Sequence, residues 1–409
     1  MLNIRRNVIF SLIEVCTSTL LTFISYRVVV MQGGIALLGI WSTLMAWLGL
    51  ARMGDFGLGG ATTRFVSPLD PAIEGARVRA YIDTAILSNF ALISSLCLIS
   101  YAIVSHWLTG VVGVANLAVA GPALPWVVGA IIASNLCMVI NSTLFALHKG
   151  FIRSIIMITG NLVQLLCVIV LVPRYGLVGF AIAQIVQFSL GAVAAWVAVC
   201  MTLGKLRLPL AFRPSVLREM LAISLKLQFA TILNTFFEPL SKMLISHFAG
   251  MRVQGLYEAA YRAVTIARNL SSNSATATVP AMARLIHSDL AEAQRLYRVT
   301  CRNIARGLFL VFGGLVLASP VISLLWFKSM QMQFVVFVAL LSVGNLVGGW
   351  CSPAYNLGQA TGNMRGVIIA MGSSVILLAV GGLAMGLLGY PLAIVAMVSC
   401  SVVVSNLLV

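Results

Sequence analysis

The sequence predicts an all-α polytopic membrane protein of about 12 transmembrane helices, arranged as two parallel, pseudo-symmetric six-helix bundles. Composition is the first indication. Of the 409 residues, 60% are hydrophobic and only 9% are charged, whereas roughly a quarter of a soluble domain is charged. The second indication is a series of apolar stretches, each about 20 residues long, which is the length of helix that crosses a bilayer. The third is an internal repeat that relates the two halves of the chain.

Apolar stretches of this length follow one another along the whole chain. Proline and glycine separate some of them, as at 173–176 and 389–391, because these residues interrupt a helix. The segment 320–331 has two interpretations: it ends the ninth span, or it lies along the outer membrane surface with Trp326 as its anchor. We predict spans at residues 8–31, 35–62, 80–105, 122–147, 151–173, 176–203, 218–248, 254–283, 299–319, 332–357, 365–388 and 389–409.

The basic residues indicate the orientation of these spans. A net charge of +16 would suggest nucleic acid in a soluble protein, but here the basic residues fall mostly in short loops. We therefore expect the lipid bilayer as a partner and no nucleic acid. With a cytoplasmic N-terminus, only Arg174, Arg252 and Lys328 lie on the outer side, which predicts a multi-pass protein with both termini in the cytoplasm. The basic residues on the inner side are Arg5, Arg6, Arg64, Arg77, Arg79, Lys149, Arg153, Lys205, Arg207, Arg213, Arg218, Arg284, Arg295, Arg298, Arg302, Arg306 and Arg365.

The chain divides near its middle at a polar link rich in basic residues and proline. We predict an N-terminal bundle at 1–203, a cytoplasmic linker at 204–217 and a C-terminal bundle at 218–409. When 39–69 is aligned with 255–285, the two segments share six identities in 31 columns. Two parallel repeats of six helices are typical of transporters in which the substrate binds between the repeats.

We single out ten charged residues inside the predicted spans, where a charge that faces lipid costs on the order of 3 kcal/mol or more. They concentrate on the first two spans of each half, so we expect these four spans to line a hydrated cleft. The charged residues are Arg27, Arg52, Lys226, Lys242, Arg262, Arg268, Glu14, Asp55, Glu238 and Glu258.

Two interpretations of these charges are open. Glu238 and Lys242 are four residues apart, as are Glu258 and Arg262, so each pair can form an ion pair on one helix face. Alternatively, the six basic residues outnumber the four acidic ones and create a positively charged cavity, in which guanidinium groups bind phosphate oxygens. On the second interpretation, the candidate substrate-binding residues are Arg27, Arg52, Arg262, Arg268 and Lys242.

Other side chains are candidates for ion coupling and for contacts with sugars. Aromatic rings can stack on sugar rings, although packing within the membrane is their commoner role. The eight cysteines form no C-x-x-C pair and the four histidines are far apart, so we expect no metal. We also expect no cofactor and no catalytic residue. The candidates for coupling to H⁺ or Na⁺ are Glu14, Asp55, Glu238 and Glu258. Those for sugar stacking are Trp41, Tyr257 and Tyr261.

One motif resembles a known family. The stretch Asp55-Phe56-Gly57-Leu58-Gly59-Gly60-Ala61-Thr62-Thr63-Arg64 is similar to the D-F-G-L-(G/S)-x-A-x-x-R motif of O-antigen flippases of the Wzx type, within the MOP superfamily that includes MATE exporters. Members carry Gly-hydrophobic-Trp/Tyr before this motif, and Gly39-Ile40-Trp41 supplies it. The span count, the repeat and the short loops extend the resemblance along the whole chain.

The resemblance implies a MATE-like fold and a transporter of the bacterial inner membrane rather than an enzyme. It implies alternating access, an undecaprenyl-pyrophosphate-linked oligosaccharide as the substrate, and polysaccharide-assembly proteins as partners. It also implies a cationic cavity, for which Arg27, Arg52, Arg262 and Arg268 are the corresponding positions. A MATE-like exporter of drugs or small solutes is the alternative. A membrane glycosyltransferase or polymerase is less favoured, because the longest outer loop, 106–121, contains no acidic residue.

Overall fold

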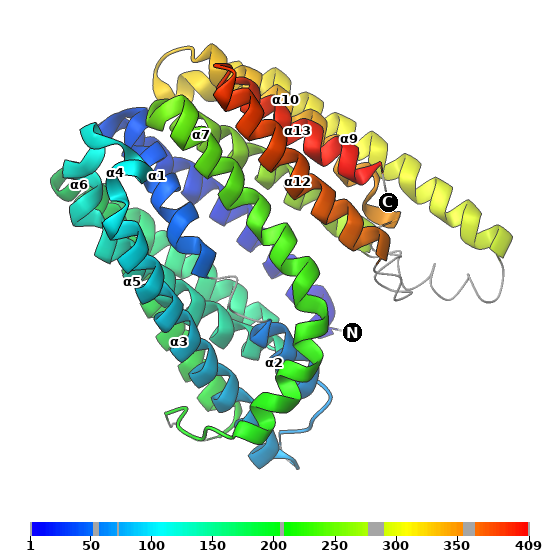
Figure 1. Ribbon diagram of the computed structural model, residues 1–409. Coiled ribbons are helices and arrows are strands. Elements are labelled where there is room, and N and C mark those ends of the chain that lie inside the picture. The colour runs from blue at the N-terminus through cyan, green and yellow to red at the C-terminus, as the bar shows by residue number, and fades with distance from the viewer. Residues whose placement is uncertain are drawn as a thin grey trace. The chain divides into compact units, whose positions relative to one another are not determined.

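The computed structural model describes residues 2–51, 57–71, 73–204, 208–276, 290–354 and 365–407 (Figure 1). These residues form helices and no strands, which confirms the all-α prediction. A helix suits an apolar chain in lipid because it satisfies its backbone hydrogen bonds within one segment. The helices are α1 (Leu2–Gly49), α2 (Leu58–Val66), α3 (Gly75–His106), α4 (Leu108–Val112), α5 (Leu117–Ala146), α6 (Gly150–Thr202), α7 (Pro214–Thr276), α9 (Leu290–Phe327), α10 (Met332–Trp350), α12 (Arg365–Leu387) and α13 (Ala393–Asn406).

Three of these helices are interrupted at a glycine that separates two predicted spans. The glycine has φ of 76° at Gly34 in α1, 53° at Gly176 in α6 and 83° at Gly250 in α7. This backbone conformation is strained for a residue with a Cβ atom, so glycine is the residue that allows it. With these breaks, the described helices follow the twelve predicted spans in order.

The turns repeat along the chain as the sequence does. Gly250 corresponds to Gly34 when the sequence repeat is extended upstream, and ψ at the two residues is 170° and 176°. The repeat therefore begins before the aligned segment 39–69. Turns between later spans also form pairs that are separated by a similar number of residues. One pair is Gly113 and Lys328, the other is Gly176 and Gly389, and all four residues have positive φ.

Most of the helices have the length and composition of a membrane span. Seven described stretches are long and apolar enough to cross a bilayer, and two of them, Ile9–Gly49 and Gly150–Thr202, contain a glycine break and so cover two predicted spans each. The helix α7 is not one of the seven, and it carries many of the charged residues. The chain is thus a multi-pass membrane protein.

Two segments differ in detail from the sequence-based interpretation. The second predicted span, 35–62, is too long, because α1 ends at Gly49 and a separate helix, α2, begins after Gly57. Gly57, the residue directly before α2, adopts a left-handed conformation. The segment 320–331 ends the ninth span, because α9 continues to Phe327. Trp326 is only 2% exposed and packs on Phe334, with ring centroids 5.8 Å apart.

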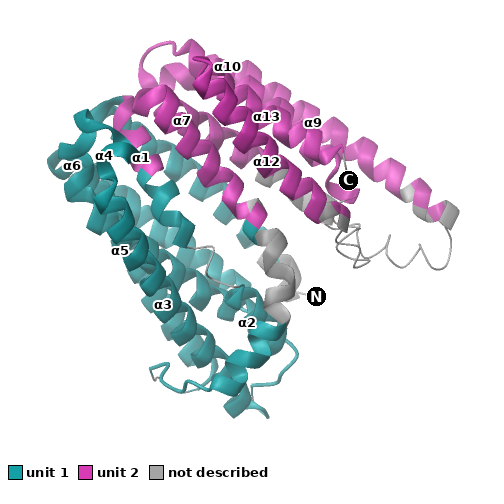
Figure 2. Cartoon of the chain, viewed as in Figure 1, with its two compact units in different colours: residues 1–34, 44–232 teal, residues 35–43, 233–409 magenta. Residues whose placement is uncertain are grey.

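The chain forms two compact units, of which unit 1 comprises residues 1–34 and 44–232 (Figure 2). Its core includes Tyr81 and Met220, and the start of α3 holds the segment that leads into α7. The N–H of Ala211 donates to Asp83 Oδ2 and the N–H of Arg213 donates to Thr84 Oγ1, both at 3.2 Å. The link after α6 is therefore bound to α3 by its backbone.

Unit 2 comprises residues 35–43 and 233–409 (Figure 2). Its helices approach closely at small residues. Between α10 and α13, a Cβ atom on Gly344 would lie 3.1 Å from the Cα of Ser399, whose hydroxyl donates to the Leu340 carbonyl at 2.6 Å. Between α12 and α7, Gly382 and Gly386 face Leu244 and Phe248. Small residues let these helices pack without large gaps.

The boundaries of the units differ from the predicted bundles in two segments. Residues 35–43 belong to unit 2 and residues 218–232 belong to unit 1, although each comes from the other half of the sequence. The predicted linker, 204–217, nevertheless lies where α6 has ended and α7 begins. The bundles 1–203 and 218–409 describe the sequence repeat and stay a prediction as structural domains.

Candidate functional site

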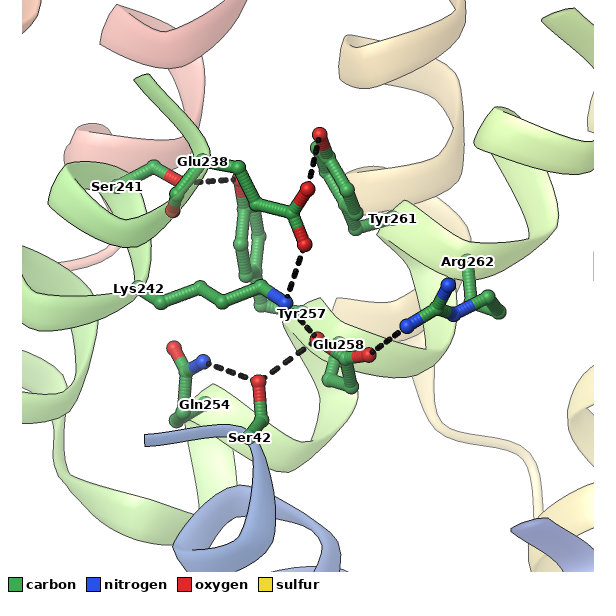
Figure 3. A network of polar contacts seen from close by, with 9 residues as sticks. All are labelled: Ser42, Glu238, Ser241, Lys242, Gln254, Tyr257, Glu258, Tyr261 and Arg262. Atoms are coloured by element: carbon green, nitrogen blue, oxygen red, sulfur yellow. Dashed lines mark hydrogen bonds and ion pairs between the residues drawn. The ribbon is translucent and has the colours of Figure 1, made fainter. Parts of the chain in front are cut away.

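A network of polar side chains lies inside unit 2 (Figure 3). It joins α7, on both sides of the break at Gly250, to the part of α1 that follows Gly34. Burial of so many polar groups in a membrane helix is costly unless they bind one another. The network consists of Ser42, Glu238, Ser241, Lys242, Gln254, Tyr257, Glu258, Tyr261 and Arg262.

Lys242 is the centre of the network. Its ammonium Nζ lies 2.6 Å from Glu238 Oε1 and 2.7 Å from Glu258 Oε2, and only 6% of its side chain is exposed. The two carboxylates come from opposite sides of the break in α7, so Lys242 ties these two parts of the helix together. A single buried cation here balances part of the charge of two anions.

Glu258 is the most completely buried charge of the network, with 2% of its side chain exposed. Its Oε1 accepts a hydrogen bond from Arg262 Nη2 at 3.1 Å, and its Oε2 accepts one from Ser42 Oγ at 2.7 Å in addition to the contact with Lys242. The amide Nε2 of Gln254 donates to Ser42 Oγ at 3.1 Å. Glu258 thus has partners on both oxygens, one of them from a different helix.

Two tyrosines complete the network on the side of Glu238. Tyr261 Oη donates to Glu238 Oε2 at 3.3 Å. Tyr257 is fully buried, and its hydroxyl donates to Ser241 Oγ at 2.9 Å, which in turn donates to the Glu238 carbonyl at 2.8 Å. Both rings are therefore held in place by hydrogen bonds.

A close helix crossing brings Ser42 to Glu258. A Cβ atom on Gly39 would overlap the carbonyl oxygen of Met251, and one on Gly255 would overlap the carbonyl oxygen of Ile35. In the alignment of the two halves, Met251 corresponds to Ile35 and Gly255 to Gly39. The contact of Gly39 with Met251 is therefore the repeat equivalent of the contact of Gly255 with Ile35. Such reciprocal contacts are those expected around a two-fold pseudo-axis.

The charges of this network balance. Lys242 and Arg262 face Glu238 and Glu258, so both predicted i,i+4 ion pairs form, which is the first of the two interpretations of the sequence. A phosphate group would have to displace a carboxylate to reach the buried ammonium group of Lys242 in this conformation. Protonation of Glu258 or Glu238, in contrast, would remove one partner of Lys242 and would change the charge of the whole network.

Glu14 lies in a second polar cluster, in unit 1. Its side chain is 11% exposed, and its Oε2 accepts a hydrogen bond from Ser154 at 2.7 Å and lies 3.4 Å from Arg153 Nη1. One turn further along α1, Ser18 accepts a hydrogen bond from Asn161 Nδ2 at 2.6 Å. Glu14 is therefore an internally bound carboxylate between α1 and α6.

The other candidate residues occupy different places. Arg27 is half-buried on α1 in unit 1, and within the described parts of the chain it forms no ion pair. Arg268 is exposed on α7 in unit 2. Arg52 and Asp55 lie outside the described residues, as does the side chain of Lys226. The predicted roles of all the candidate residues in substrate and ion binding stay predictions.

Two of the three aromatic candidates are buried. Trp41 is 3% exposed and Tyr257 is fully buried, so neither offers an open ring face in this conformation. Tyr261 is half-buried. In the described parts of the chain, no three His, Cys, Asp or Glu side chains are placed to hold a metal ion.

Sequence reasoning missed the residues that depend on the fold. Lys242 binds Glu258 across the helix break, and Ser42 and Gln254 are neutral residues that were not singled out. One signal was available for Ser42, because Glu258 occupies the corresponding position in the second half of the repeat. Positions that correspond across a two-fold repeat can meet near its axis.

Comparison with known proteins places the fold and the family. Structures with the same fold include the lipid II flippase MurJ in an inward closed conformation, with a TM-score of 0.74 and 14% identity over 98% of this chain and 86% of that one. An inward-facing multidrug resistance MATE transporter of the MOP superfamily has a TM-score of 0.69 and 14% identity over 95% of this chain and 93% of that one. A MOP superfamily transporter from Pyrococcus furiosus has a TM-score of 0.65 and 13% identity over 99% of this chain and 93% of that one.

These likenesses confirm the MATE-like fold that the resemblance implied. No curated protein sequence is significantly similar to this chain. Residues 77–330, which are more than half of the sequence, match a family described as polysaccharide biosynthesis protein. With the fold of the MOP superfamily and this match, the chain belongs to the polysaccharide biosynthesis protein family.

Proposed function

We propose that this protein is a flippase that moves an undecaprenyl-pyrophosphate-linked oligosaccharide from the cytoplasmic to the periplasmic leaflet of the bacterial inner membrane by alternating access. The observation that carries the proposal is a polysaccharide biosynthesis family match on a chain with a MOP transporter fold. A lipid II flippase shares that fold, which supports a lipid-linked substrate. Both termini lie in the cytoplasm in this proposal, as the distribution of basic residues predicts.

The charged residues divide between two roles in this mechanism. Arg52, Arg268 and Arg27 bind the pyrophosphate, since guanidinium groups bind phosphate oxygens in a bidentate manner. Lys242 and Arg262 already bind carboxylates, so their role is in the coupling of transport to H⁺ or Na⁺. Glu258 is the favoured coupling residue, because a change in its charge affects Lys242, Arg262 and Ser42 together.

Gene deletion in the native host tests this function. We expect a lipid-linked glycan to accumulate on the cytoplasmic leaflet, measured by mass spectrometry of extracted lipids and by accessibility of the glycan in inverted vesicles. The wild-type gene should restore the surface glycan, whereas a gene that encodes Arg52→Ala and Arg268→Ala should restore it at least about tenfold less, because two phosphate ligands are lost.

Arg252→Ala is the matched control, because Arg252 is also an exposed arginine on α7. It should restore the glycan fully. Full restoration by the double variant would remove Arg52 and Arg268 from the substrate site. A deletion strain with normal glycan and raised sensitivity to cationic drugs would instead support a MATE-like exporter.

A further inference from the structure

A row of arginines follows one face of α9. Arg295, Arg298, Arg302 and Arg306 are spaced by three, four and four residues, which places them on the same side of a helix, and all four are exposed. We call them the α9 basic stripe. The side chain of Arg295 is 76% exposed. The stripe thus presents four guanidinium groups to the surroundings along three turns of helix.

The opposite face of α9 packs into unit 2. Thr300, Ile304 and Leu308 are 6%, 8% and 2% exposed, and a Cβ atom on Gly349 of α10 would lie 2.7 Å from Leu308. The first turns of α9 extend past the end of α13 in the same unit (Figure 1). The basic stripe therefore lies on the side of α9 that faces away from the helices it packs on.

The described parts of the chain do not neutralise the stripe. Arg295 lies 3.9 Å from Glu292, but both side chains are more than half exposed, so this ion pair is weak. Arg298 Nε donates to the Gln294 carbonyl of its own helix at 3.4 Å. Within the described residues, Arg302 and Arg306 have no carboxylate at ion-pair distance. Most of the positive charge of the stripe is therefore available to an external partner.

The stripe continues into a surface that faces lipid. Beyond Arg306, Phe309, Leu310 and Leu317 are 68%, 75% and 82% exposed, and the helix is a candidate membrane span up to Phe327. About 20 residues cross the hydrocarbon layer, so the segment 308–327 fills it. With a rise of about 1.5 Å per residue, Arg306 to Arg295 then extends about 16 Å outward, through the layer of lipid headgroups.

We propose that the α9 basic stripe binds the phosphate groups of anionic phospholipids at the membrane surface nearest the N-terminus of α9. Clusters of four or more basic residues next to a membrane span attract anionic lipid, and guanidinium groups bind phosphate oxygens bidentately. An orientation signal requires only the number of basic residues on one side of the membrane. It does not require them on one exposed helix face that continues into the lipid-facing surface.

Native mass spectrometry of the full-length protein tests the proposal. The protein is extracted from vesicles of equal phosphatidylglycerol and phosphatidylethanolamine, and the retained lipids are counted. We expect enrichment of phosphatidylglycerol on the wild type, and a fall of at least about fivefold in Arg298→Gln/Arg302→Gln/Arg306→Gln, because three charges near the headgroups are lost. Higher salt should also reduce the enrichment.

Two further variants make the result decisive. Arg174→Gln/Arg252→Gln/Lys328→Gln removes the same charge from exposed positions elsewhere and should retain the wild-type enrichment. Arg298→Lys/Arg302→Lys/Arg306→Lys keeps the charge and should retain most of the phosphatidylglycerol enrichment. This variant also gives a folded comparison if the glutamine variant is unstable. Equal enrichment in all four proteins, or equal loss in both glutamine variants, would overturn the proposal.

Discussion

Lys242 shows at the scale of one residue how this protein keeps charges inside a membrane. Its ammonium group is bound by two carboxylates, one of which, on Glu258, is itself almost completely buried. Removing one partner of such a group leaves an uncompensated buried charge, which costs more than the original interaction contributes. The network is therefore sensitive to the loss of any one of its charges.

Lys242→Met is expected to destabilise the protein by about 3–5 kcal/mol, because Glu258 would lose its buried cation. The measurement is the temperature at which the detergent-solubilised protein loses its monodisperse peak in size-exclusion chromatography. Adding Glu258→Gln should recover part of the loss, and Lys328→Met, at an exposed position, should have little effect. If Lys242→Met alone were as stable as the wild type, the network would not be a stabilising element.

Ser42→Ala is expected to cost about 1–3 kcal/mol in the same assay, because it removes a hydrogen bond to a carboxylate and leaves Gln254 Nε2 without its acceptor. Ser25→Ala is the matched control, because Ser25 is also buried on α1 but, among the described residues, bonds only the Leu21 carbonyl of its own helix, at 2.9 Å. Equal effects at the two serines would show that the contact with Glu258 contributes little.

The sequence predicted part of this site and not the rest. Spacing along one helix was sufficient for the ion pairs of Glu238 with Lys242 and of Glu258 with Arg262, because residues four apart share a helix face. The contact between Lys242 and Glu258 spans a break in α7 and depends on the angle of the turn at Gly250. Periodicity carries no information on that angle.

At the scale of helices, glycine determines both where the chain turns and where helices cross. The predicted turn at 173–176 coincides with the break at Gly176, since proline and glycine together mark it in the sequence. Gly39 and Gly255 have no such mark, because neither stands next to a proline, and their importance comes from the neighbouring backbone. The indications in the sequence were the alignment of these two glycines in the repeat and the place of Gly39 in the motif Gly39-Ile40-Trp41.

Gly39→Ala is expected to destabilise the protein by about 1–3 kcal/mol or more, because the added Cβ meets the backbone of Met251, which cannot rotate away as a side chain can. Gly255→Ala should behave in the same way against Ile35. Gly313→Ala in α9 has open space around its Cβ and should be neutral or stabilise by up to about 1 kcal/mol. Thermal unfolding in detergent measures all three, and a neutral Gly39→Ala would contradict the close crossing.

At the scale of the whole molecule, composition and span length were sufficient for the fold class. The low charge content and the repeated apolar stretches predicted a polytopic helical protein, and the described helices follow those spans. The assignment of 35–43 to unit 2 and of 218–232 to unit 1 was not predictable, because it reflects contacts between distant segments. Local patterns place helices in order along the chain but do not assign them to units.

The exchange of segments 35–43 and 218–232 has a consequence for biosynthesis. Ser42 leaves the ribosome long before Glu258, its partner in the second half of the chain, and unit 1 lacks residues 218–232 until most of the first half is already in the bilayer. Domains usually complete themselves in order as they are translated. In this chain unit 2 cannot do so, because residues 35–43 are made long before residues 233–409, so this short segment enters the bilayer before the rest of its unit exists.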